Sequence, residues 1–174
     1  MRRDITKCCR LIRYGVIDAN SRVTGRDFLL KIWKLIASTP LSVGILHEDM
    51  PIQTQANIFY ELGVAQALGK ETVIVKSANS VVPSDFVRSD YVTFDKSFEK
   101  NFMKYLEGLS EQASHYEIVS EQLDRNPILA IDYLRRAYLI TGNKAYRKKA
   151  QKLLGEAGVE TRAKNSVELL IAAF

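Results

Sequence analysis

The sequence predicts an α/β protein: an open, doubly wound parallel sheet with helices on both faces, followed by an all-helical appendage. Two short runs rich in branched apolar residues, 41–47 and 71–76, flank a stretch with helical periodicity, which is the pattern of a βαβ unit. From about residue 114 onward the periodicity is helical only. We therefore expect an α/β domain over residues 1–110 and a helical appendage for interaction or oligomerisation over residues 114–174.

The elements on either side of the βαβ unit follow from the same patterns. A helix from about Asp4 to Tyr14 precedes a short strand around residues 16–18, and a second helix runs from Arg26 to Ser38. After the unit, residues 91–94 form a last short strand, and a helix from about Ser97 to Leu109 covers one face of the sheet. The inward-facing positions predicted for the helix over residues 26–38 are Phe28, Leu29, Ile32, Trp33, Leu35 and Ile36.

The helical appendage has clear start signals. Asn126 followed by Pro127 is an N-cap with a proline at the first helical position, and Gly142 separates this helix from the next one. Asn165 with Glu168 offers a capping box for one more helix, which ends in Leu-Leu-Ile-Ala-Ala-Phe. We expect these helices to pack on each other, and they can either mediate a homo-oligomer or another interaction or simply pack onto the sheet domain.

Composition and charge exclude several classes of protein. The chain has 174 residues, 47% hydrophobic and 26% charged, which is typical of a globular protein. It shows neither an apolar run long enough for a bilayer nor the apolar stretch of a signal peptide, so we expect a cytoplasmic protein without a membrane partner. Cys8 and Cys9 are adjacent and are expected to be reduced thiols.

The amino-terminal part of the chain is strongly basic. Residues 1–34 carry nine basic and three acidic side chains, which accounts for more than the whole net charge of +5. Such an excess attracts phosphate-bearing ligands or nucleic acid, although bases spaced along helices are more often a solvated face. Because no aromatic residues are interleaved with these bases, nucleic acid is not an expected partner. Motifs typical of metal sites and of serine hydrolases are absent, so neither a metal nor a bound cofactor is expected.

The helix predicted over residues 53–68 carries the most informative polar residues. It is largely apolar, yet Asn57 and Glu61 lie four residues apart and therefore on one face. The start of this helix follows the carboxyl end of the strand at 41–47, which is where open α/β sheets bind ligands. We expect Asn57 and Glu61 to face that crevice.

At this point the sequence resembles a known superfamily. The residues concerned are Asn57-Ile-Phe-Tyr-Glu61-Leu-Gly63-Val-Ala65-Gln-Ala67-Leu-Gly69-Lys70, the strand Val73-Ile-Val75, and Val82-Pro83-Ser84-Asp85-Phe86. Over residues 30–95 the chain is similar to the TIR-like and nucleoside 2-deoxyribosyltransferase-like superfamily. The resemblance implies a flavodoxin-like domain that binds a nucleoside or a nucleotide such as NAD and breaks an N-glycosidic bond.

The resemblance also implies roles for individual residues. Glu61 corresponds to the catalytic carboxylate that acts at the sugar, where it stabilises or captures an oxocarbenium-like centre. Asn57 and Tyr60 can hold a ribose hydroxyl or orient that carboxylate. In the transferase branch a second acid protonates the departing base, and the local candidates are Glu48 and Asp49, with His47 at the strand end. Pro83 and Asp85 complete the candidate substrate-binding residues.

Each candidate also has a plain structural interpretation. Glu61 can be the ion-pair partner of an arginine or a backbone cap, His47 a strand-end histidine, and Asp85 a turn cap after Pro83. The residues before the helix lack the Gly-Thr turn of the transferases, which favours the TIR-like branch over deoxyribosyl transfer. A non-catalytic nucleotide sensor that signals through its carboxyl-terminal helices is the alternative function.

The amino-terminal region departs from the superfamily pattern. The chain begins where the family has its first helix, so the family's first strand, in the middle of a 2-1-3-4-5 sheet, is expected to be missing. We therefore expect a TIR-like domain that is short at its amino end and in which Glu61 cleaves NAD or a related nucleotide.

Overall fold

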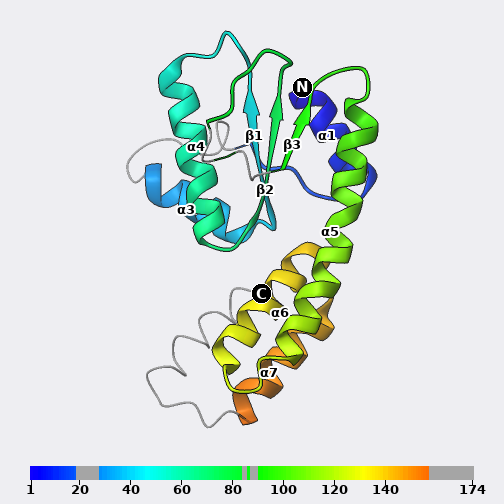
Figure 1. Ribbon diagram of the computed structural model, residues 1–174. Coiled ribbons are helices and arrows are strands. Elements are labelled where there is room, and N and C mark those ends of the chain that lie inside the picture. The colour runs from blue at the N-terminus through cyan, green and yellow to red at the C-terminus, as the bar shows by residue number, and fades with distance from the viewer. Residues whose placement is uncertain (19–27, 84–85, 87–89, 157–174) are drawn as a thin grey trace. The chain divides into compact units, whose positions relative to one another are not determined.

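The computed structural model of the protein describes residues 1–18, 28–83, 86 and 90–156, which form two compact units, Met1–Leu106 and Glu107–Phe174. In the first unit the order of elements is a helix, a helix, a strand, a helix and two strands (Figure 1). These elements are α1 (Arg2–Leu11), α3 (Phe28–Ser38), β1 (Leu41–Leu46), α4 (Ile52–Ala67), β2 (Glu71–Lys76) and β3 (Asp90–Thr93). Three helices follow: α5 (Phe98–Glu121), α6 (Pro127–Thr141) and α7 (Lys144–Glu156).

The three described strands form one parallel sheet in the order β1-β2-β3. Val43 pairs with Val73 across the first pair of strands, and Val75 pairs with Val92 across the second. The central strand β2 has a continuous apolar run because both of its faces are covered, and Val73, Ile74 and Val75 are each fully buried. The α/β class and the βαβ unit predicted from the sequence are confirmed.

Helix α4 packs closely on one face of this sheet. Leu62 of α4 forms a buried cluster with Leu46 and Ile74, and Ile58 packs against it. The approach depends on Gly44 of β1, because a Cβ atom there would lie 2.8 Å from Cδ1 of Leu62. Gly69, at φ +67°, follows the helix and turns the chain toward β2, which is a common position for a glycine after a helix C-terminus.

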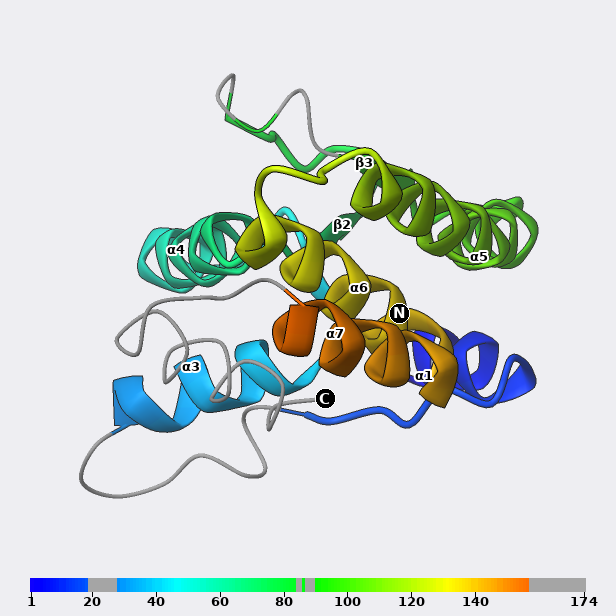
Figure 2. The ribbon, with the colours of Figure 1, turned by 90° about the horizontal axis from the view of Figure 1, so that it is seen from below.

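Helix α5 lies on the other side of the sheet from α4, and α1 lies beside α5 (Figures 1 and 2). Val73 and Val75 alternate with Ile74 along β2 and therefore point away from α4. An ion pair joins α1 to α5, with 2.8 Å between Nζ of Lys7 and Oε1 of Glu99. Ile5, Cys8 and Cys9 form the buried face of α1, and both thiols are free, as expected.

Helix α3 packs on α4 through a narrower stripe than the sequence predicts. Ile32 and Ile36 are buried against Ala65 of α4, and Leu35 is partly buried there. Leu29 and Trp33, predicted to face inward, are 55% and 45% exposed, so that prediction is wrong. The reason is that α4 covers only the narrow face of α3 that contains Ile32 and Ile36. Arg26, and the side chain of Phe28, lie outside the described part of the chain.

Two other sequence predictions are corrected by the structure. The segment around Val16 and Ile17 is not a strand: both side chains are more than 40% exposed, and the described sheet contains only β1, β2 and β3. Without a neighbouring strand to pair with, a β-rich tripeptide has no reason to be extended. The helix predicted to end at Leu109 continues to Glu121, because its buried stripe continues through Ala113 and Tyr116 with no proline between.

The second unit consists of packed helices. Asn126 caps α6 as predicted, because its Oδ1 accepts a hydrogen bond from the backbone N–H of Leu129 at 3.1 Å. Ile131, Leu134 and Ala150 are buried between the helices. The helix predicted after Asn165 lies outside the described residues. Within the part of the chain that the structure describes, none of the helices combines the length and apolarity that crossing a bilayer requires.

Candidate functional site

Glu61 is the most unusual polar residue of the first unit. It lies in the third turn of α4 and is half-buried. Its carboxylate has neither a hydrogen-bond nor an ion-pair partner among the described residues, so the arginine-partner and cap interpretations find no support there. Burial raises the pKa of Glu61 above its usual value, with no charged neighbour to oppose the shift. A poorly solvated carboxylate of this kind is typical of functional sites.

The packing of α4 determines where Glu61 lies. Ile58 and Leu62 face the sheet, while Val64 and Ala65 pack against α3. Glu61 precedes Ala65 by one helical turn and therefore lies on the flank of α4 toward α3. Burial on this flank removes water from the carboxylate without supplying a counter-charge.

Asn57 and Tyr60 lie on exposed surface of the same helix. Asn57 is one turn before Glu61, and Tyr60 is 49% exposed. At about 1.5 Å per residue, Asn57 lies about 8 Å and Glu61 about 14 Å from the first residue of α4. The Asn57/Glu61 pair therefore lies along the helix, beyond the turn at which the helix dipole acts on a ligand.

A second group of polar residues gathers where β1 and β2 end. The backbone N–H of Asp49 donates to Nδ1 of His47 at 3.3 Å, and 3.5 Å separates this nitrogen from Oδ2 of Asp49. The carboxylate of Glu48 accepts a hydrogen bond from the Ser77 hydroxyl. His47 and Asp49 are largely exposed, whereas Ser77 is buried, so the group extends from solvent into the sheet edge.

The loop after β2 contributes residues that the sequence analysis missed. Buried Ser77 and Ser80 have their hydroxyl oxygens 2.7 Å apart. The ammonium of Lys76 donates to the backbone oxygen of Ser80 at 3.0 Å and lies 5.4 Å from the ring centre of Tyr91. The available signal was the polar string Ser-Ala-Asn-Ser directly after a buried strand, since parallel sheets collect ligand-binding groups at such ends.

Of the two candidate residues after β2, Pro83 lies within the described part of the chain and Asp85 does not. Pro83 is exposed, and its backbone oxygen accepts from the N–H of Phe86 at 2.9 Å. The ring of Phe86 packs on Phe59 of α4 at a centroid distance of 4.9 Å, which attaches this loop to the helix that carries Glu61. Asp85 lies outside the described residues.

The predicted site residues thus fall into two groups, one on the flank of α4 and one at the carboxyl edge of the sheet. The first offers an unpaired carboxylate and an amide, and the second offers hydroxyls, carboxylates and a lysine. Among the described residues, no cluster of three or more His, Cys, Asp or Glu side chains is arranged to hold a metal ion.

Comparison of the chain with family models, curated proteins and solved structures gives no match. The function is therefore inferred from the side chains of the two groups.

Proposed function

We propose that the first unit is a TIR-like, flavodoxin-like nucleotide-binding domain in which Glu61 cleaves the N-glycosidic bond of NAD or a related nucleoside or nucleotide. One observation carries the proposal: Glu61 is half-buried on α4 and has no partner among the described residues. The motif around Asn57, Tyr60 and Glu61 supplies the choice of substrate class.

An unpaired, half-buried carboxylate favours a positive charge beside it. Burial removes hydration from the charged form of Glu61, and this raises its pKa. A positive charge that develops next to it restores part of the lost electrostatic stabilisation. Cleavage of an N-glycosidic bond develops such a charge on the sugar, so the carboxylate interacts more strongly with the transition state than with the neutral substrate.

Neighbouring residues have supporting roles in this proposal. Asn57, one turn earlier on the exposed side of α4, is placed to bind a ribose hydroxyl, and Tyr60 can do the same from the helix edge. The hydroxyl and lysine group at Lys76, Ser77 and Ser80 offers donors for the polar end of a nucleotide.

The experiment is incubation of the full chain with NAD and with nucleosides, followed by measurement of released nicotinamide or free base. We expect Glu61→Gln, which keeps the shape and removes the charge, to lower turnover by at least about 100-fold while ligand binding persists. Glu111→Gln, at an exposed position on α5, is the matched control and should leave turnover unchanged. Equal turnover in the wild type and in Glu61→Gln would remove the catalytic role.

A specific observation favours a second candidate, a nucleotide sensor without turnover. Glu48 is already engaged by Ser77, and Asp49 contacts His47, so neither stands as a free second acid beside Glu61 among the described residues. Calorimetry that detects nucleotide binding while no product forms would support the sensor, which would signal through the helices of the second unit.

A further inference from the structure

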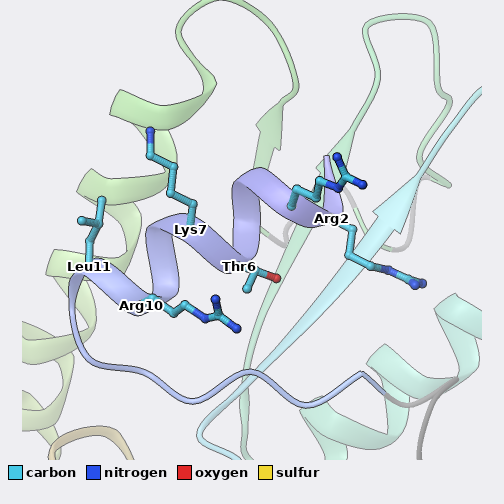
Figure 3. Close-up of a pocket in the computed structure, with 6 residues that line it drawn as sticks. Arg2, Thr6, Lys7, Arg10 and Leu11 are labelled. Carbon is cyan, nitrogen blue, oxygen red and sulfur yellow. The ribbon is translucent and has the colours of Figure 1, made fainter.

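A basic groove runs along the outer surface of α1. Its volume is about 580 Å³, and the described residues that line it come from α1: Arg2, Arg3, Thr6, Lys7, Arg10 and Leu11 (Figure 3). Four of these six side chains are cationic and none is acidic. The opposite face of the helix, with Ile5, Cys8 and Cys9, is buried in the first unit, so the charges are held on one side.

The cations of the groove differ in their partners. Arg2 pairs with Asp18, with 2.9 Å between Nη1 and Oδ2, and Lys7 reaches toward α5, where it pairs with Glu99 (Figure 3). Arg3 and Arg10 have no hydrogen-bond or ion-pair partner among the described residues. Two guanidinium groups, each able to bind a phosphate in bidentate geometry, are thus available to a ligand.

We infer that this groove binds duplex nucleic acid through its phosphates. Arg3 and Arg10 are seven residues apart, so they lie about 10 Å apart along the helix axis at about 1.5 Å per residue. One strand of a duplex carries a phosphate about every 3.4 Å along its axis. A distance of about 10 Å between the two guanidinium positions exceeds the size of one phosphate group, so Arg3 and Arg10 contact separate phosphates, as a polymer backbone provides.

The lining residues also indicate how the duplex is bound. The described residues that line the groove include no Asn, Gln or aromatic side chain that would read or stack on bases, so their contacts position the backbone without selecting a sequence. The sequence-based expectation against nucleic acid rested on the missing aromatic residues, which backbone contacts do not need. An anionic membrane is a poorer match, because the apolar face of α1 is buried in the protein and Leu11 alone is apolar in the groove.

The test measures binding of a short labelled duplex DNA by fluorescence anisotropy between about 50 and about 200 mM salt. With two phosphate contacts, the logarithm of the association constant should fall with the logarithm of salt concentration at a slope of about −1.8. The double variant Arg3→Gln/Arg10→Gln should bind more weakly, with a slope nearer to zero. These two residues are chosen because their substitution breaks no ion pair of the fold.

The matched control is Arg147→Gln/Lys148→Gln on α7, which removes the same charge from exposed positions of the second unit. It should bind the duplex like the wild type. Absence of binding at the lowest salt, or an equal loss in both double variants, would overturn the inference. So would displacement of the duplex by equimolar ATP, or binding to vesicles containing anionic lipid with none to the duplex. Circular dichroism of each variant verifies that the fold is retained.

Discussion

The two compact units of the chain satisfy their polar groups to different degrees. In the second unit, Lys149 donates to the carboxylates of both Glu117 and Glu121, so these two acidic side chains of α5 are matched by a base on α7. In the first unit, Glu61 is half-buried with no partner among the described residues. A half-buried carboxylate without a counter-charge is more typical of a binding or catalytic site than of a structural scaffold.

Other side chains show the same difference between the two units. In the second unit, Nε of Arg136 donates to Asp132 at 2.9 Å, and the guanidinium lies 5.1 Å from the ring centre of Tyr133. On the surface of the first unit, Trp33 is 45% exposed and Arg3 has no partner among the described residues. The unmatched carboxylate of Glu61 therefore indicates where a ligand is to be sought in the first unit.

The largest expected effect on stability concerns the core of the second unit. Leu134 is 1% exposed, and Leu134→Ala should lower the free energy of unfolding by about 2–5 kcal/mol. Far-UV circular dichroism follows all helices, while fluorescence of Trp33, the single tryptophan, follows the first unit. We expect the dichroism transition to move to lower temperature while the Trp33 transition stays in place. Equal shifts of both transitions would show that the two units unfold as one.

The next effect concerns the contact between α4 and the sheet. Gly44→Ala should destabilise the first unit by about 1–3 kcal/mol, because the new Cβ would lie 2.8 Å from Leu62 and 3.0 Å from Ile58. Gly63→Ala on α4 is the matched control: nothing lies within 4 Å of its Cβ position, so this change should stabilise the helix by about 0.5–1 kcal/mol. Chemical denaturation followed by Trp33 fluorescence measures both, and shifts of the same sign would contradict the packing described here.

The smallest expected effects concern how the stability of the fold depends on pH. Glu61 and Glu117 contribute to this dependence with opposite signs. Burial raises the pKa of Glu61, so its charge destabilises the fold above that pKa, and the penalty disappears as the pH falls through it. Lys149 lowers the pKa of Glu117, so that carboxylate stabilises the fold above pH 4.5, and the contribution is lost as the pH falls through the lowered pKa.

Two variants test this difference. At pH 7, Glu61→Gln should be more stable than the wild type and Glu117→Gln less stable, and both differences should shrink on acidification. Urea denaturation at several pH values between neutral and about 4 measures them. A wild type more stable than Glu61→Gln at pH 7 would mean that the Glu61 carboxylate has a favourable partner.

The strands of the sheet could be predicted from sequence because their signal is local. Residues 72–75 are all β-branched, and β2 is buried on both faces. The end of α5 was misplaced because Gly108, next to Leu109, lies inside the helix rather than after it, no proline follows before Pro127, and the buried stripe continues through Ala113 and Tyr116. The exposure of Trp33 was missed for a related reason: a helical pattern shows which residues are apolar, but not how wide a stripe the neighbouring helix covers.

The candidate site was predictable to a smaller extent. Spacing alone puts Asn57 and Glu61 on one face of a helix, but their depth along α4 depends on where the helix begins, at Ile52. Ser77 and Ser80 were missed because the hydrogen bond from Ser77 to Glu48 joins two loops that are separated along the chain by α4 and β2, and Ser80 contacts Ser77 rather than Glu48. The groove on α1 could not be located from the sequence either. The buried positions of Cys8 and Cys9 show which face of the helix is covered, and therefore which face presents the basic side chains.

The length of α5 has a practical consequence for dissecting the protein. The boundary between the two units, at Leu106 and Glu107, falls inside this one continuous helix. A fragment cut there would break the i to i−4 hydrogen bonds that cross the boundary and leave a new helix end without a cap. Expression of the first unit alone therefore calls for a fragment that keeps additional turns of α5 or carries a designed C-cap.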